Sequence, residues 1–195
     1  MYPNKKIKEF NTLIVGTGGQ GQITLLQILA EAALFEGYDV KTSELHGLSQ
    51  RGGSVEVHLR FGKNIYSPLI SRGKANLILG LEMQEALKAY LFANPKTTFL
   101  MNKEIISIPL EKNLTEKNIL KNLKKITKNV FLIPATEICQ KGVGNKVVAG
   151  VYLLSLASFK KLIPIKPASI LKAIKKIIPK KYLELNLKTF NLAKS

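Results

Sequence analysis

The arrangement of apolar residues and glycines near the N-terminus constrains the fold of this chain more than any other feature. Residues 12–15 form a short apolar run that ends at Gly16, and a helical apolar pattern follows over residues 22–35. Gly37 closes that helix, and residues 38–43 have the composition of a second strand. A strand, a glycine turn, a helix and a second strand form a βαβ unit, whose crossover implies a parallel sheet. The predicted fold class is α/β.

An alternating segment then interrupts the parallel order. Over residues 54–61 apolar and polar side chains alternate strictly, which predicts a half-buried strand. Residues 62–64 are a candidate turn leading to residues 65–67, so we expect an antiparallel hairpin inserted into the sheet. Further patterns predict strands at residues 77–79, 98–101, 105–108 and 130–133, and helices near residues 84–93 and 115–126.

The C-terminal part of the sequence reads as helical. From residue 135 onward there are only helical patterns, interrupted by prolines. The uncharged apolar run between Lys146 and Lys160 is shorter than the ~20 residues that span a bilayer, so it predicts a buried helix and no membrane partner. The 195 residues are therefore expected to form one domain over residues 1–195, with a Rossmann-like, mostly parallel mixed sheet over about 11–134 and a helical layer over about 135–195.

The net charge of +17 is distributed unevenly. Residues 1–110 have 12 basic and 9 acidic side chains, whereas residues 111–195 have 18 lysines and 4 glutamates. The C-terminal half lacks arginine and has few aromatic residues, which disfavours a nucleic-acid partner. A solvated lysine face and a docking face for an acidic protein both remain open. The N-terminal lysines precede no apolar stretch typical of a signal peptide, so a cytoplasmic location is expected.

Cysteine and histidine are scarce. The single Cys139 excludes an internal disulfide and an iron–sulfur cluster held by this chain alone. His46 and His58 are too few for a zinc site without help from other ligands. We therefore expect no metal or redox cofactor to be held by this chain alone.

The first candidate site is the G-x-G-x-x-G motif at residues 16–21. Between a strand and a helix, such glycines allow a tight turn and the close approach of an anion to the helix N-terminus. Three interpretations remain open: a bound NAD or FAD with Glu44 as the ribose acceptor, a phosphate-bearing ligand shared with another subunit, and a turn that serves packing only.

The second candidate site is the polar loop over residues 43–54. It follows the second strand, and ligands of open α/β sheets bind at the carboxyl ends of strands. Arg51 is one of only three arginines, and its planar fork suits a carboxylate, a phosphate or a structural ion pair. His46 is either functional or a hydrogen-bonded loop residue. We expect residues 46–51 of this loop and residues 18–21 to share one sheet edge and to form one wall of a cleft that another subunit completes.

These motifs resemble a known family. The runs GTGGQGQ and SELHGLSQRGGSVEVHLRFG, the Tyr66-Ser67-Pro68 segment and Gly144-Asn145 are similar to the small (beta) subunits of indolepyruvate:ferredoxin oxidoreductases, within the 2-oxoacid:acceptor oxidoreductase gamma-domain family. The resemblance implies a large (alpha) partner subunit that carries thiamine diphosphate and iron–sulfur clusters. It also implies conversion of an aryl 2-oxoacid and coenzyme A to acyl-CoA, carbon dioxide and reduced ferredoxin, with no activity of this chain alone.

The resemblance also marks positions expected to contact a cofactor, without a catalytic role for any of them. They are Gly16, Gly18, Gly19, Gln20, Gly21, Ser43, Glu44, His46, Gln50, Arg51, Gly52, Gly53 and Ser54. The alternatives are a gamma subunit acting on pyruvate or a branched-chain 2-oxoacid, and a free-standing dinucleotide-binding protein.

Overall fold

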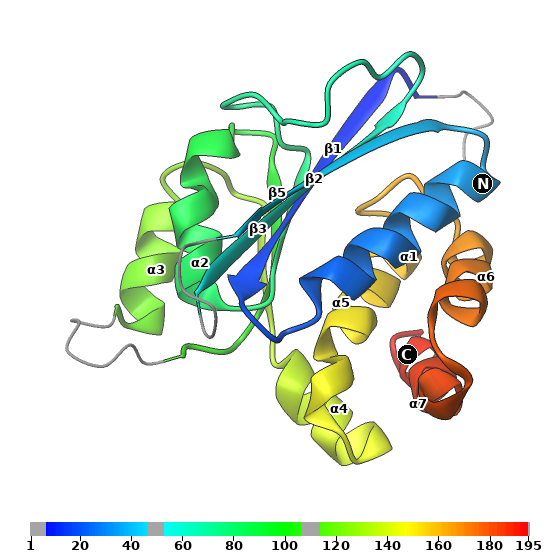
Figure 1. The fold of residues 1–195 in the computed structure, drawn as a ribbon. Helices are drawn as coiled ribbons and strands as arrows, with labels where there is room; N and C mark the ends of the chain where they lie inside the picture. The colour runs from blue at the N-terminus through cyan, green and yellow to red at the C-terminus, as the bar shows by residue number, and fades with distance from the viewer. Residues whose placement is uncertain (1–6, 47–52, 107–113, 195) are drawn as a thin grey trace.

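A six-stranded sheet lies between two layers of helices in the computed structural model, which describes residues 7–46, 53–106 and 114–194 (Figure 1). The strand order is β2-β3-β1-β4-β5-β6. The strands are β1 (Glu9–Thr17), β2 (Asp39–His46), β3 (Ser54–Gly62), β4 (Leu77–Gly80), β5 (Thr98–Asn102) and β6 (Val130–Ile133). The fold is α/β, as predicted.

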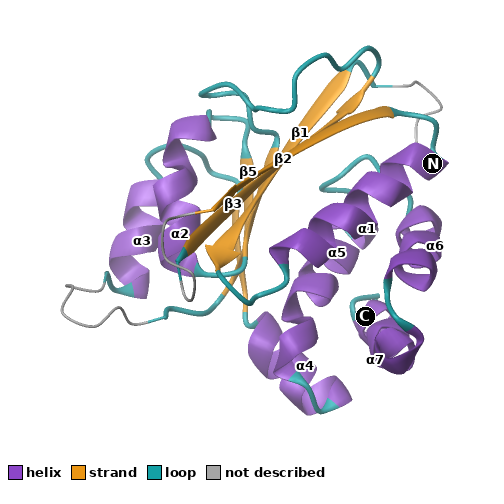
Figure 2. Ribbon diagram, in the orientation of Figure 1, coloured by secondary structure: helices purple, strands orange, loops and turns teal. Residues whose placement is uncertain are grey.

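The helices divide unequally between the two faces of the sheet (Figure 2). One face is covered by α2 (Met83–Lys88), the 3₁₀ helix η1 (Ala89–Phe92) and α3 (Glu116–Leu123). The other is covered by α1 (Gln22–Phe35), α4 (Ala135–Val143), the 3₁₀ helix η2 (Lys146–Val148), α5 (Ala149–Phe159), α6 (Pro167–Ile177) and α7 (Lys180–Leu192). The predicted helix over residues 22–35 and the helical character of the C-terminal part are confirmed.

The antiparallel part of the sheet differs from the prediction. β3 pairs antiparallel with both β1 and β2, while β1, β4, β5 and β6 are mutually parallel neighbours. The hairpin partner of β3 is therefore β2, and the predicted strand at residues 65–67 is wrong. Because β1 and β2 occupy both edges of β3, no edge remains for a third partner. The first two strands run in the same direction, as the βαβ unit predicts, but β3 lies between them.

The strand predicted at residues 105–108 is absent from the part of that segment that the structure describes. Residues 105 and 106 are not in a strand, because the Ile106 N–H donates to the Glu82 carboxylate instead of to a sheet neighbour. Residues 107 and 108 lie outside the described residues. The strands predicted at 77–79, 98–101 and 130–133 correspond to β4, β5 and β6.

Each face of the sheet has its own apolar core. The alternating apolar residues of β3 pack towards α1 and α5, whereas Leu13 and Val15 of β1 pack towards α2 and α3. The uncharged run after Lys146 forms α5, in which residues 149–158 are buried, as predicted. Among the helices of the described ranges, none has both the length and the apolar character that a bilayer span needs.

Candidate functional site

The loop between β1 and α1 has an open side formed by left-handed glycines. Gly19 has φ 97° and Gly21 φ 83°, a backbone conformation that glycine adopts without steric cost. A Cβ at either position would meet no atom within 4 Å. Within the described residues no side chain caps α1 and no acidic residue lies in its first turn. The amides and the positive dipole end of this helix are thus suited to an anion.

Two glutamines close the same loop from the inside. The Gln20 Oε1 accepts a hydrogen bond from the Thr17 N–H at 2.9 Å, and the Gln22 Nε2 donates to the Thr17 carbonyl at 2.8 Å. A Cβ at Gly16 would lie 2.5 Å from the Gln20 Oε1, so Gly16 leaves space for these amides. The sequence singled out Gln20 but not Gln22, which is only 2% exposed although it begins the helix.

The glycine loop and the polar loop meet at one sheet edge. The Gly18 N–H donates to the Gly53 carbonyl at 2.9 Å, Thr17 lies opposite Ser54, and His46 lies opposite Val55. The expectation of a shared edge is confirmed for the strand ends. Residues 47–52, and with them Gln50, Arg51 and Gly52, lie outside the described residues.

Ser54 is connected to a buried carboxylate that the sequence did not single out. Its hydroxyl donates to the Glu85 carboxylate, which also contacts the Lys88 Nζ at 2.7 Å. Glu85 is 5% exposed and lies in α2, on the other side of the sheet from α1. The end of the polar loop is thereby fixed to α2.

Ser43 and Glu44 are not brought to the glycine loop. Ser43 lies opposite His58 and Glu44 opposite Val57, so the two side chains lie on opposite faces of the edge strand β2. In dinucleotide-binding βαβ units the acidic ribose acceptor follows the strand beside the first one. Here β3 occupies that place, which disfavours the dinucleotide interpretation.

A small cleft of 190 Å³ opens at the carboxyl ends of β1, β4 and β5. Its polar centre is Asn102, whose Nδ2 donates to the Glu104 Oε2 at 2.9 Å and to the Thr136 Oγ1 at 2.8 Å. Gly19 and Gln20 line the cleft from one side and Lys146 from another. Of these side chains the sequence indicated only the glycine loop. Asn102 directly follows the strand predicted at residues 98–101, at the same sheet edge, which is the signal that could have found it.

Glu82 holds the floor of this cleft in place. Its carboxylate accepts from the Glu85 N–H at 2.7 Å and from the Ile106 N–H at 3.2 Å, which ties the segment after β5 to the end of β4. The side chain is 1% exposed, and burial raises the pKa of its carboxyl above the ordinary value.

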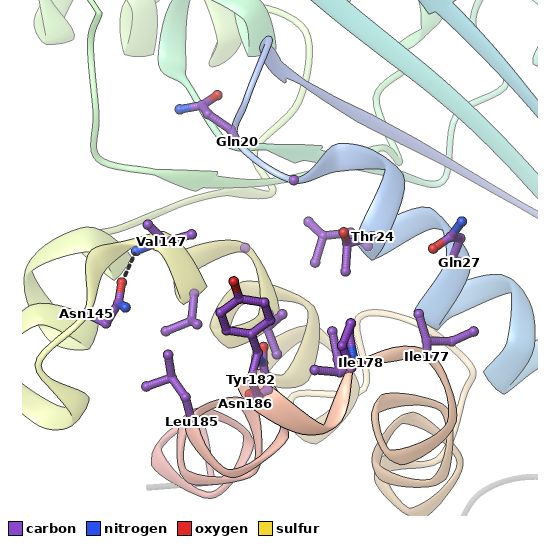
Figure 3. A pocket seen from close by; sticks show the side chains of 16 residues that line it. Gln20, Thr24, Gln27, Asn145, Val147, Ile177, Ile178, Tyr182, Leu185 and Asn186 are labelled. Atoms are coloured by element: carbon purple, nitrogen blue, oxygen red, sulfur yellow. Dashed lines mark hydrogen bonds between the residues drawn. The ribbon is translucent and has the colours of Figure 1, made fainter.

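A larger groove of 620 Å³ continues from the cleft on the far side of the glycine loop (Figure 3). It lies between α1, the η2–α5 segment and the α6–α7 segment, and its lining contains no charged residue. Gln20, Val147 and Gly150 line both cavities. The uncapped helix and Lys146 can bind a ligand with an anionic group. The Asn102 side chain is already bonded to Glu104 and Thr136, so its network shapes the cleft rather than binding an anion. Within the described ranges, no three His, Cys, Asp or Glu residues are grouped as a metal site would require.

Comparison with known proteins identifies the family. The model of the pyruvate ferredoxin/flavodoxin oxidoreductase family matches residues 11–195. The chain belongs to this family. It is 35% identical to the indolepyruvate oxidoreductase subunit IorB of Archaeoglobus fulgidus, over 93% of this chain and 92% of that protein. It is 32% identical to the corresponding subunit of Thermococcus kodakarensis, over 95% of both chains.

The fold of this family member also matches a solved structure. The pyruvate oxidoreductase subunit PORC of Thermotoga maritima superposes with a TM-score of 0.69 at 18% sequence identity, covering 96% of each chain. At that identity the likeness establishes the fold. The family resemblance drawn from the two loops is confirmed.

Proposed function

We propose that this chain is the small (beta) subunit of an indolepyruvate:ferredoxin oxidoreductase. The similarity to two IorB subunits along nearly the whole chain carries this proposal. The assembled enzyme would convert an aryl 2-oxoacid, coenzyme A and oxidised ferredoxin to acyl-CoA, carbon dioxide and reduced ferredoxin. The cytoplasmic location expected from the sequence is part of the same proposal.

In this proposal a large (alpha) subunit holds thiamine diphosphate and the iron–sulfur clusters. The state of the only thiol supports that division. Cys139 is fully buried, and burial raises the pKa of its thiol to about 11. A cluster ligand must be a thiolate, which this site disfavours. Ferredoxin would receive electrons from the partner subunit.

The glycine loop is the part of this chain that fits a phosphate. No described side chain caps the N-terminus of α1, and Gly19 and Gly21 leave the outer side of the loop open. The ammonium group of Lys146, which lines the same cleft, adds positive charge. We assign the phosphate to coenzyme A, with Arg51 and the large subunit completing the site. Gln20 and Ser54 then act by fixing the two loops.

Reconstitution tests the proposed activity. The chain and its large subunit, purified separately and then mixed, should reduce ferredoxin with indolepyruvate and coenzyme A, while this chain alone should be inactive. The value of kcat/KM should be higher for indolepyruvate than for pyruvate or a branched-chain 2-oxoacid. A preference for pyruvate would replace the indolepyruvate assignment by the pyruvate type.

The phosphate role is tested by two matched glycine variants. Gly73 has φ 68° and lies at the opposite sheet edge, where its N–H donates to the Leu91 carbonyl. Gly73→Ala and Gly19→Ala should each lose about 1–2 kcal/mol of stability from the left-handed backbone. Only Gly19→Ala should also raise the KM for coenzyme A in the assembled enzyme. An equal KM in both variants would leave Gly19 a purely conformational role.

A further inference from the structure

The 620 Å³ groove beside the glycine loop has an uncharged, mainly apolar lining. Val147 is 76% exposed on one bank and Tyr182 is 51% exposed on the other. Figure 3 shows the Tyr182 ring directed into the groove from α7, with Thr24 and Gln27 of α1 along the facing wall. Isolated exposed apolar residues are common, but two that flank an apolar cavity of this volume mark a binding surface.

The surroundings of the groove are strongly basic. Lys146, Lys180 and Lys181 are exposed and adjoin lining residues in the sequence. None of the three forms an ion pair within the described residues, although the Lys181 Nζ lies 5.4 Å from the centre of the Tyr182 ring.

Two carboxylates on the helices that line the groove are paired with lysines. Glu31 of α1 pairs with Lys176 at 2.6 Å, and Glu184 of α7 pairs with Lys188 at 2.8 Å. Residues 160–194 contain ten lysines, and Glu184 is their only acidic residue. The potential around the groove is therefore positive, and it attracts a segment of opposite charge.

We propose that this groove is the docking site for an acidic segment of the partner subunit, which inserts apolar side chains between Val147 and Tyr182. The inserted side chains would fill the uncharged lining, and carboxylates beside them would pair with Lys180 and Lys181. A small anionic ligand would match the lysines but not the apolar interior. The inference rests on the proposed function only in requiring a partner subunit.

Docking here would also affect the candidate ligand site. Gln20, Val147 and Gly150 line both the groove and the 190 Å³ cleft. A segment seated in the groove would therefore bring the partner subunit to the open side of the glycine loop. The same contact would then assemble the complex and complete the ligand site.

Charge-reversal variants at one exposed position test the chemistry of the occupant. Val147→Glu places a carboxylate at the groove mouth and Val147→Lys an ammonium, and neither disturbs the core because Val147 is 76% exposed. Each variant competes with labelled unaltered chain for the purified partner subunit. Val147→Glu should bind about tenfold or more weaker, as for a central interface contact, and Val147→Lys less than about threefold weaker.

Tyr182 has a matched control in Tyr90, since both tyrosines are 51% exposed. Tyr90 lies in η1, with the helices on the opposite face of the sheet. Tyr182→Glu should weaken binding of the partner subunit about tenfold, whereas Tyr90→Glu should leave the affinity within about twofold.

The outcomes separate this inference from the proposed function. If the unaltered chain assembles with its partner and all four variants bind equally well, the docking site is overturned while the proposed function stands. Equal weakening by Val147→Glu and Val147→Lys would overturn the acidic character of the occupant. The unaltered chain could instead bind an oligonucleotide that the Lys180→Glu variant does not bind. If Lys180→Glu also bound the partner subunit as tightly as the unaltered chain does, the basic surface would be assigned to nucleic acid and the docking site overturned. Failure of the unaltered chain to assemble would overturn both proposals.

Discussion

Replacing Gly16 by alanine should destabilise the free chain without involving any ligand. The added Cβ would lie 2.5 Å from the Gln20 Oε1, 2.7 Å from the Gln22 Nε2 and 3.0 Å from the Leu81 Cβ. The glutamine amides are the ends of flexible side chains, so they would move before the backbone does. Their movement would break the two hydrogen bonds that close the glycine loop on Thr17.

The size of the effect follows from those two hydrogen bonds. Each contributes about 0.5–1.5 kcal/mol, so their loss costs about 1–3 kcal/mol. Gly16 is not among the glycines with positive φ, so its backbone conformation allows alanine. Alanine also restricts the unfolded chain, which raises the free energy of unfolding by about 0.4–1 kcal/mol and offsets part of the loss. The net loss of about 1–2 kcal/mol should lower Tm by about 2–8 °C in a chain of this length.

Urea and thermal unfolding of the free chain, followed by circular dichroism, measure this loss. The control is the same substitution in a Gln20→Ala background, where one of the two displaced amides is already absent. Gly16→Ala should cost clearly less stability there than in the unaltered chain. An equal cost in the two backgrounds, or no cost in either, would refute the packing role of Gly16.

Three other predictions concern buried or multiply bonded side chains. Arg60→Lys should lose about 1–3 kcal/mol, because the guanidinium reaches Glu9 at 2.9 Å and the Ser67 carbonyl at 2.8 Å together and an ammonium cannot; an unchanged urea midpoint would contradict this. Burial raises the pKa of Glu82 above the ordinary 4.5, so the unfolded chain loses this proton first as pH rises. Relative to Glu82→Gln, the free energy of unfolding should therefore fall from pH 4.5 upward through the folded-state pKa, and a rise would show the opposite shift. Cys139, with its thiol pKa raised to about 11, should resist iodoacetamide at pH 8 until urea unfolds the chain, and rapid labelling of the native chain would show an accessible thiolate.

Elements with a strong local pattern were predictable from the sequence. The helix over residues 22–35, the strands over 77–79, 98–101 and 130–133, and the buried helix after Lys146 each show their own periodicity or apolar run. The position of the glycine loop between a strand and a helix followed from the same local signals. So did the shared sheet edge of the two loops, because a βαβ connection returns the chain in the same direction.

The partner of β3 was decided by tertiary structure. The pattern over residues 54–61 established a strand with one apolar face, but the backbone groups of a strand pair equally well with any neighbour. Residues 65–67 were nearest in sequence, yet β2 and β1 took the two edges. The apolar sides of β1 and β2 extend the surface that packs against α1. This burial depends on contacts between segments distant in sequence, so local periodicity does not predict it.

The functional site divides along the same line. The sequence by itself determined which glycines lie at the helix N-terminus and which protein family the chain resembles. Only the tertiary structure showed that Gly16 leaves space for glutamine amides, that Ser54 is held by Glu85, and that Asn102 meets Thr136 from 34 residues away. Such contacts join segments distant in sequence, and their hydrogen bonds depend on side-chain positions that the packed sheet and helices set together.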